Sequence, residues 1–392
     1  MPLSSNSILS ISGYKVKSIE GLDPVLIRVS CTDVVRCPFC GCFELRKKSR
    51  YERRVRHESY GRRASILLIE GCKFICKGCC RYFNQRFPGI LPRKRSTEFF
   101  RKEVFEKHNN GICQSVLSKM LNIGSATIER WYHDFLKLTV SEMKNAHCPR
   151  MMGIDEHFFS RKNGYATTIC NLRNNKVFDV TLGRTDLSLE SYLKNLKGKE
   201  NVKVVVMDMA EVYRRVVKRH FPNAKIVSDR FHVIKLINYH FLKLWQQIDP
   251  DGRKNRGLLS LMRRHEYNLS REQKIKLDFY FLQHSELKPI YDFKQKLTML
   301  LLIKKQTKKE CKKLIPVFLD YIQQLKNSAL EQMVTLGKTL ESWKEEVVRM
   351  WRFTKSNGIT EGFHNKMKTI QKRAYGFRNF ENYRLRVRAL CC

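Results

Sequence analysis

The sequence predicts an α/β protein in which a mixed sheet carries helices and is interrupted by an all-helical segment. Three observations predict this fold class. Strand-like and helix-like stretches alternate over residues 151–248, a lysine-rich stretch with helical periodicity fills residues 249–351, and closely spaced cysteines precede residue 91. Because 392 residues exceed what one hydrophobic core normally serves, we expect separate regions at 1–91, 92–150, 151–248, 249–351 and 352–392.

The charge balance indicates a polyanionic partner. Lys and Arg number 76 against 37 Asp and Glu, and the formal net charge of +39 is spread from Arg46 to Arg388. Such a field attracts nucleic acid through its phosphates, although a basic ribosomal or housekeeping protein has a similar balance. No apolar stretch approaches the roughly 18 residues that span a bilayer, and residues 1–15 lack the pattern of a secretion signal. We therefore expect a nucleic-acid-binding protein of the cytoplasm with no membrane partner.

Two cysteine pairs in residues 1–91 predict a structural zinc site. Fourteen cysteines without a secretion signal indicate a reducing compartment, where paired thiols hold metal more often than they form disulfides. Cys37 and Cys40, and Cys76 and Cys79, are each separated by two residues and offer four thiolates to zinc if the chain between them folds back as a hairpin. Unliganded buried cysteines are the alternative. Four further cysteines compete for the ligand positions: Cys31, Cys42, Cys72 and Cys80.

Residues 92–150 predict a helix-turn-helix. Apolar residues from Ile112 to Leu121 fall on one helix face, residues 122–124 break the pattern, and Ser125 can cap a second helix that reaches Phe135. Two short helices around a glycine-containing turn fit a motif whose second helix enters a major groove, although any small helical hairpin gives a similar pattern. The exposed candidates for DNA contacts are Thr127, Arg130, His133 and Lys137.

Residues 151–248 predict the mixed sheet. Three strands form a meander with a hairpin turn at Asn174–Asn175, and two aliphatic strands follow, each between helices. The predicted strands are 152–159, 165–172, 177–182, 202–207 and 224–227, and the predicted helices are 187–196, 211–220 and 232–245.

Residues 249–351 predict an all-helical insertion with breaks near Pro250, Pro289 and Pro316. Lysine pairs recur every four residues and should gather on one side of a helix. A solvated helix face and a DNA-facing surface explain the pairs equally well. The pairs are Lys304–Lys305, Lys308–Lys309 and Lys312–Lys313.

Two acids in the sheet region are candidates for a metal site. Asp155 lies on the first strand, and Asp208 follows the strand that ends at residue 207. If these strands are neighbours, the two carboxylates can share Mg²⁺, and two ions about 4 Å apart would support an in-line phosphoryl displacement. Glu156 is an alternative to Asp155, but alternation points the two side chains to opposite faces of the strand, so only one can serve.

Glu361 is the third candidate acid. Ser356 or Asn357 can cap the helix that follows, which places Glu361, His364 and Lys368 on one face together with Asn365. An acid among so many cations should stay ionised, which favours metal ligation, although a surface salt bridge explains it equally well.

Five segments resemble a known family. Gly153–Glu156, Asp208 and Ser228–His232 look like the catalytic section of DDE transposases from bacterial insertion sequences, and Ser356–Gly362 with Lys372–Arg378 resembles their third-acid segment. The ISL-type (ISL-three) family is the most similar, because it also carries a four-cysteine zinc finger followed by a helix-turn-helix.

The resemblance implies a catalytic site and a reaction. Asp155, Asp208 and Glu361 match the three acids that bind Mg²⁺ or Mn²⁺ on an RNase H-like fold with a helical insertion, and Asp229 and His232 match a further motif beside them. The implied partner is double-stranded DNA, as terminal inverted repeats and as target, in the bacterial cytoplasm at the nucleoid. Holding two element ends implies at least a dimer. A related metal-dependent nuclease and an inactive transposase-derived regulator are the alternatives. Four residues are expected to contact the DNA backbone: Lys368, Lys372, Arg373 and Arg378.

Overall fold

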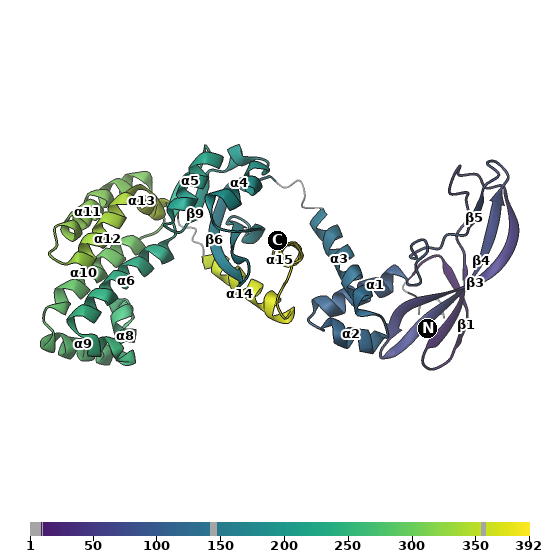
Figure 1. Cartoon of the computed structure of the whole chain (residues 1–392), viewed down its shortest axis with the longest axis horizontal. Helices are drawn as coiled ribbons and strands as arrows, with labels where there is room; N and C mark the ends of the chain where they lie inside the picture. Colours follow the sequence, from purple (N-terminus) through teal and green to yellow (C-terminus); the bar gives the residue numbers. More distant parts are fainter. Residues whose placement is uncertain (1–8, 10, 142–146, 354–357) are drawn as a thin grey trace. The chain divides into compact units, whose positions relative to one another are not determined.

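The computed structural model describes residues 9, 11–141, 147–353 and 358–392. These residues form two compact units, the first ending at Ser141 and the second comprising the rest of the chain (Figure 1). In the part of the chain that is described, no helix combines the length and the hydrophobicity needed to cross a membrane.

The first unit is built on a sheet with strand order β1-β2-β4-β3, and β5 pairs with β4. β3 and β4 form a long antiparallel hairpin that pairs Leu45 with Cys76 at its open end, which confirms the hairpin expected between the cysteine pairs. One face buries an aliphatic core that includes Ile27, Val55 and Leu67. The strands are β1 (Tyr14–Glu20), β2 (Val25–Cys31), β3 (Leu45–Tyr60), β4 (Arg63–Cys76) and β5 (Tyr82–Asn84).

Three helices complete the first unit: α1 (Glu98–Asn109), α2 (Gln114–Leu121) and α3 (Ser125–Ser141). The helical stretches expected on either side of residues 122–124 are present as α2 and α3, and α1 is an additional helix. The Thr97 hydroxyl caps α1 by accepting a hydrogen bond from the Phe100 amide, and Asn122 ends α2 in the left-handed conformation.

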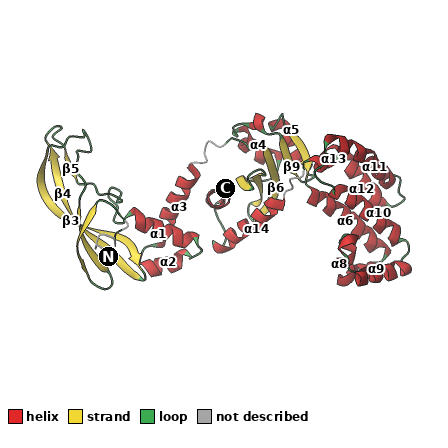
Figure 2. Cartoon of the chain, turned by 180° about the vertical axis from the view of Figure 1, so that it is seen from behind, coloured by secondary structure: helices red, strands yellow, loops and turns green. Residues whose placement is uncertain are grey.

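The sheet of the second unit has strand order β10-β9-β6-β7-β8. Its strands are drawn in yellow among the surrounding helices in Figure 2, where β6 and β9 are labelled. β6, β7 and β8 are antiparallel neighbours, whereas β9 is parallel to β6 and β10 is parallel to β9. All five expected strands are present. They are β6 (Met151–Ser160), β7 (Gly164–Asn171), β8 (Lys176–Leu182), β9 (Val204–Met207) and β10 (Lys225–Ser228).

Helices pack on both faces of this sheet. On β7, the Thr167 hydroxyl lies 3.0 Å from the Tyr213 hydroxyl of α5, and the next hydroxyl, Thr168, lies 3.1 Å from His364 Nε2 of α14. Because successive strand residues point to opposite faces, α5 and α14 cover opposite sides. The helices are α4 (Asp186–Lys194), α5 (Glu211–His220), α14 (Gly358–Arg373) and α15 (Phe380–Cys391).

A long helix, α6 (Arg230–Ile248), leaves the sheet and runs into the helical insertion (Figure 1). Its last turns, around Trp245, share a second core with helices of the insertion. The insertion comprises α7 (Pro250–Lys254), α8 (Arg256–Arg263), α9 (Arg271–Gln283), α10 (Leu287–Leu302), α11 (Lys308–Lys326), α12 (Glu331–Ser342) and α13 (Lys344–Arg352).

Two details of the insertion differ from the sequence prediction. Pro250 begins α7 and Pro289 lies in the first turn of α10, as expected for breaks, but Pro316 lies inside α11. Pro316 is exposed, so water can satisfy the backbone group that loses its helical partner. Lys304 and Lys305 precede α11, so only the two later lysine pairs share a helix face.

The basic tail also differs from expectation, because its last arginines face the protein. Arg384 on α15 makes a bidentate ion pair with the buried Asp179 of β8, at 2.9 and 2.7 Å, and Arg388 Nε lies 3.8 Å from the same carboxylate. These cations fix α15 on the sheet. The exposed cations of this segment are Lys366, Lys368, Lys372, Arg373 and Arg378.

Candidate active site and zinc site

Three acids lie just past the parallel pairing of three neighbouring strands: Asp155 lies within β6, which continues to Ser160, whereas Asp208 and Asp229 follow the ends of β9 and β10. Ile154 of β6 pairs with Met207 of β9, which in turn pairs with Ser228 of β10. The next residue on each strand is an acid, namely Asp155, Asp208 and Asp229. The Asp229 amide also donates to the Met207 carbonyl oxygen at 2.6 Å, which keeps the third strand end in register. The carboxyl edge of the sheet thus collects acidic side chains from segments up to 74 residues apart.

Burial and mutual repulsion raise the pKa values of these acids. The pKa of Asp155 is raised to about 6, chiefly by burial. The nearby Asp208 and Asp229 contribute to this rise, whereas His232 opposes it. Burial likewise raises the pKa of Asp208, with Glu156 and Asp229 adding to it and His232 again opposing it. The edge therefore favours a bound cation, which would relieve the repulsion.

The oxygen atoms at this edge fit a hard divalent cation. Asp208 Oδ1 is buried and has no hydrogen-bond partner among the described residues, so it is available as a ligand. Mg²⁺ and Mn²⁺ prefer carboxylate oxygens together with water and phosphate oxygens. In the described ranges, however, only the four paired cysteines bring three or more ligand atoms within 4.8 Å of one another, so the acids form an open arrangement.

Glu156 lies on the opposite face of β6 from Asp155, although it is near enough to Asp208 to raise the pKa of that acid. In the antiparallel pairing of β6 with β7, Asp155 lies opposite Thr168 and Glu156 lies opposite Thr167, and paired residues share a face. Asp155 is thus on the side of α14. Glu156 instead accepts an ion pair from Arg184 at 3.0 Å.

The helix that carries Glu361 lies beside the first acid. Glu361 is exposed in the first turn of α14, and one turn later His364 Nδ1 lies 3.9 Å from Asp155 Oδ2. The proposed caps, Ser356 and Asn357, lie outside the described residues. Asp208 and Glu361 are 153 positions apart in the sequence. The strand that precedes Asp208 and the helix that carries Glu361 nevertheless both lie next to Asp155.

A buried polar network holds α14 and α15 against β6 and β7. His157 Nδ1 lies 2.9 Å from the Thr168 hydroxyl, and its Nε2 lies 2.8 Å from the Tyr383 hydroxyl of α15. Burial lowers the pKa of His157 to about 3 and that of His364 to about 4, so both imidazoles are neutral at pH 7. Sequence reasoning did not single out His157, Thr168 or Tyr383, because no local spacing links residues so far apart.

The two residues of the neighbouring motif lie at the same edge. Asp229 is buried and precedes α6, and His232 Nε2 lies 3.8 Å from Asp229 Oδ2. His232 lies close enough to Asp155 and Asp208 to lower the pKa values of both acids. Both residues therefore influence the acids directly.

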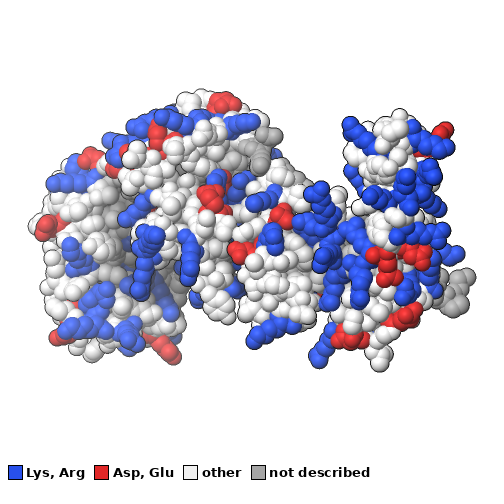
Figure 3. All heavy atoms as spheres, turned by 45° about the vertical axis from the view of Figure 1, so that its right-hand side comes forward, with Lys and Arg blue, Asp and Glu red and all other residues white. Residues whose placement is uncertain are grey.

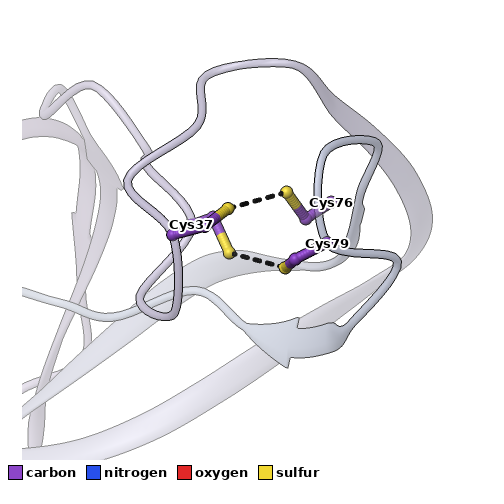
Figure 4. A group of neighbouring side chains, drawn as sticks. Cys37, Cys76 and Cys79 are labelled. Carbon is purple, nitrogen blue, oxygen red and sulfur yellow. Dashed lines mark hydrogen bonds between the residues drawn. The ribbon is translucent and has the colours of Figure 1, made fainter.

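The four paired cysteines form a compact sulfur cluster at the open end of the β3–β4 hairpin (Figure 4). Cys37 Sγ lies 3.6 Å from Cys79 Sγ, and Cys40 Sγ lies 3.5 Å from Cys76 Sγ. Thiolates at about 2.3 Å from a tetrahedral zinc ion are separated by about 3.8 Å, so the cluster fits zinc. The ligand set expected from the sequence is thus brought together, which supports structural Zn²⁺.

Matching turns orient the sulfur atoms. Cys37 Sγ accepts hydrogen bonds from the amides of Phe39 and Cys40, and Cys76 Sγ accepts them from the amides two and three residues later, Gly78 and Cys79. Amide donors of this kind stabilise thiolates. The competing cysteines lie outside the cluster: Cys31, Cys42, Cys72 and Cys80.

The candidate DNA contacts of α3 are only partly exposed. Arg130 and Lys137 are exposed, whereas Thr127 and His133 are half-buried, and Arg130 Nη2 donates to the Thr127 hydroxyl at 3.2 Å. Figure 3 shows Lys and Arg outnumbering Asp and Glu over the displayed face.

Comparisons with known proteins agree with this geometry. Residues 152–387, more than half of the chain, match the transposase family of the DDE, ISL3 type. Residues 33–79 match the zinc-finger of transposases IS204/IS1001/IS1096/IS1165, a range that includes all four clustered cysteines. The transposase for insertion sequence element IS1001 from Bordetella parapertussis is 22% identical, over 96% of this chain and 95% of that protein. The chain belongs to the ISL3 family of insertion-sequence DDE transposases.

Proposed function

We propose that the chain cuts DNA at the ends of its insertion sequence and joins those ends to new DNA, using Asp155, Asp208 and Glu361. The observation that carries the proposal is the row of acids formed by Asp155 within β6 and by the residues that follow β9 and β10, with the Glu361 helix beside it. The strand order and directions support an RNase H-like fold for this part, with residues 249–351 as its helical insertion.

The reaction consists of two phosphoryl transfers. In the first, a water oxygen bonds to the phosphorus at the element boundary, the bond from phosphorus to the 3′ oxygen breaks, and that oxygen takes up a proton. In the second, the freed 3′ hydroxyl loses its proton and bonds to a target phosphorus, which releases a target 3′ hydroxyl. Bound Mg²⁺ or Mn²⁺ would supply charge neutralisation for the attacking and leaving oxygens. Asp155, Asp208 and Glu361 would hold these ions, and no covalent enzyme intermediate is required.

The first unit would recognise the element ends. The zinc ribbon of residues 1–91 and the α2–α3 pair of residues 92–150 suit a double-stranded terminal inverted repeat, with α3 in the major groove as in a helix-turn-helix. Thr127, Arg130 and Lys137 would contact the DNA there. In the second unit, Lys368, Lys372, Arg373 and Arg378 are exposed near the Glu361 helix and would contact the backbone. Two chains would hold the two ends of the element.

The test combines purified protein, a labelled duplex carrying the ends of the element, and Mg²⁺ or Mn²⁺. We expect metal-dependent 3′-end cleavage and joining, reduced at least ~100-fold, or about 3 kcal/mol, in Asp208→Asn and in Glu361→Gln. Glu200→Gln, an exposed acid of the same unit, is the matched control and should retain activity.

The products separate the alternatives. Cleavage without joining would identify a nuclease, and binding without cleavage would identify a DNA-binding regulator. Wild-type activity in the Asp208→Asn or Glu361→Gln chain would overturn the assignment of that acid.

A further inference from the structure

A groove runs along the outer face of α6, starting at the acid edge. It encloses about 750 Å³ between α6 and the arginines Arg253 of α7 and Arg263 of α8. It begins at Phe231, whose ring packs edge-on against His232 at 5.5 Å between centroids. His232 in turn lies 3.8 Å from Asp229. One end of the groove thus lies two residues along the chain from Asp229, and the other end lies in the helical insertion.

The groove is positively charged and therefore favours an anionic ligand. Lys235, Lys243, Arg253 and Arg263 line it, and none of its described lining residues is acidic. α6 itself contains no Asp or Glu in its 19 residues. From Phe231 to Gln246 the helix rises ~22 Å, the length of about six stacked nucleotides. A cationic groove of this length suits a phosphodiester backbone.

Two aromatic side chains within the groove indicate unpaired bases. Phe231 and Tyr239 are 56% and 57% exposed, and the spacing of eight residues places them on the same face, about two turns apart. Bases offer their flat faces to such side chains only when they are not stacked in a duplex. Between them the groove is lined by Asn238, whose side-chain amide offers both a hydrogen-bond donor and an acceptor.

We propose that this groove binds unpaired nucleotides of the DNA strand next to the reacting phosphodiester. The inference rests on the proposed function only in taking DNA as the substrate. Lys235, Lys243, Arg253 and Arg263 contact the phosphates, and Phe231 and Tyr239 stack on bases. A strand held here is anchored on a rigid helix whose first residue follows Asp229.

The test measures the affinity of the full chain for two end-labelled duplexes of the same sequence, one blunt and one with a six-nucleotide single-stranded extension. No Mg²⁺ or Mn²⁺ is added, so that no cleavage occurs. We expect the wild-type chain to bind the tailed duplex more tightly than the blunt one. The ratio of the two affinities should fall by about fivefold or more in Tyr239→Ala, and by a similar factor in the separate variant Phe231→Ala. Tyr239→Phe keeps the ring and should keep the preference, whereas Tyr239→Leu should lose it.

A matched control lies on α9. Phe279 is 63% exposed but does not line the groove, so Phe279→Ala should leave the preference unchanged. Equal affinity of the wild-type chain for both duplexes would overturn the proposal. Equal losses in Phe279→Ala and Tyr239→Ala, or retention in Tyr239→Leu, would also overturn it, because stacking in this groove would not be the cause.

The outcome is separable from that of the proposed function. A chain that prefers the tailed duplex but cleaves nothing in Mg²⁺ or Mn²⁺ would support the groove and overturn the strand-transfer proposal. A chain that cleaves and joins but binds both duplexes equally would support strand transfer and overturn the groove.

Discussion

The zinc ribbon and the acid edge are both suited to metal ions, but they are built in opposite ways. All four cysteines lie within 43 positions, at one end of a single hairpin, and turn amides orient their sulfur atoms. The acids Asp155, Asp208 and Glu361 span 207 positions and depend on strand pairing and on the packing of α14. A site made by one local element suits a closed structural role, whereas a site assembled from distant elements can stay open to substrate.

The largest effect expected from this contrast is the unfolding of the hairpin region around residues 37–79 when one zinc ligand is removed. Structural zinc contributes about 10–16 kcal/mol of apparent binding energy in small domains, and a local site has few other contacts to replace it. We expect Cys76→Ser to lose zinc, measured by elemental analysis, and to expose residues 37–79 to protease. Cys80→Ser, an exposed neighbour outside the cluster, should keep both properties. A Cys76→Ser chain that retains zinc and protease resistance would contradict the comparison.

The next effect concerns the ion pair between Arg384 and Asp179, which holds α15 against β8. Arg384→Gln removes the bidentate partner of the buried Asp179, which keeps the Val180 amide at 2.8 Å and, as a cation, Arg388 at 3.8 Å. Breaking such a pair costs about 3 kcal/mol or more. We expect a corresponding loss of unfolding free energy in denaturant titrations, together with slower DNA cleavage, because α15 shares contacts with α14.

The double variant Asp179→Asn/Arg384→Gln removes the uncompensated charge and should recover part of the stability. A single variant as stable as the wild type would show that α15 is held by its apolar contacts alone.

Local patterns predicted much of this fold, and the failures share a cause. Alternation and aliphatic runs identified all five strands of the second sheet, and spacing identified the zinc ligands. The direction in which the α15 arginines point, and the approach of His364 to Asp155, depend on packing between residues about 200 positions apart. Composition shows that Arg384 is charged, but it does not show that Arg384 forms an ion pair with Asp179. Selection of Cys79 over the adjacent Cys80 likewise depends on turn geometry, with Cys80 at a φ of 55°.

A smaller effect tests the electrostatic difference between the two sites. The folded-state pKa of Asp155 is raised from 3.8 to about 6, chiefly by burial, so the folded chain holds this proton more tightly than the unfolded chain. The contribution of Asp155 to the unfolding free energy should therefore fall by roughly 1–3 kcal/mol as pH rises from about 4 to about 6, and then level off, in addition to the contributions of Asp208 and the other titrating groups. Asp155→Asn should remove this fall and be the more stable chain at pH 7 without added Mg²⁺.

Tryptophan fluorescence during urea titration, in chains that also carry Trp131→Phe in the first unit, would follow the second unit, which holds Trp245, Trp343 and Trp351. Asp320→Asn, an exposed acid on α11, is the control and should follow the wild-type curve. If Asp155→Asn also follows that curve, the ionised Asp155 carboxylate does not destabilise the folded chain. The acid edge would then carry no electrostatic cost in the absence of metal.

The smallest effect separates cations on the helix that carries Glu361 from cations that only contribute to the general field. Lys372 and Arg373 are exposed at the end of the Glu361 helix, whereas Lys308 and Lys309 are exposed on α11 of the insertion. Each phosphate contact contributes about 0.9 to the slope of log affinity against log salt concentration. Replacing Lys372 and Arg373 by Gln should lower that slope by up to ~1.8, without changing the unfolding free energy. The same change at Lys308 and Lys309 should leave the slope unchanged if that helix face is solvated. Equal reductions in the two variants would show that DNA binding follows total charge, and that the position of a cation relative to the acid edge does not decide which phosphates it contacts.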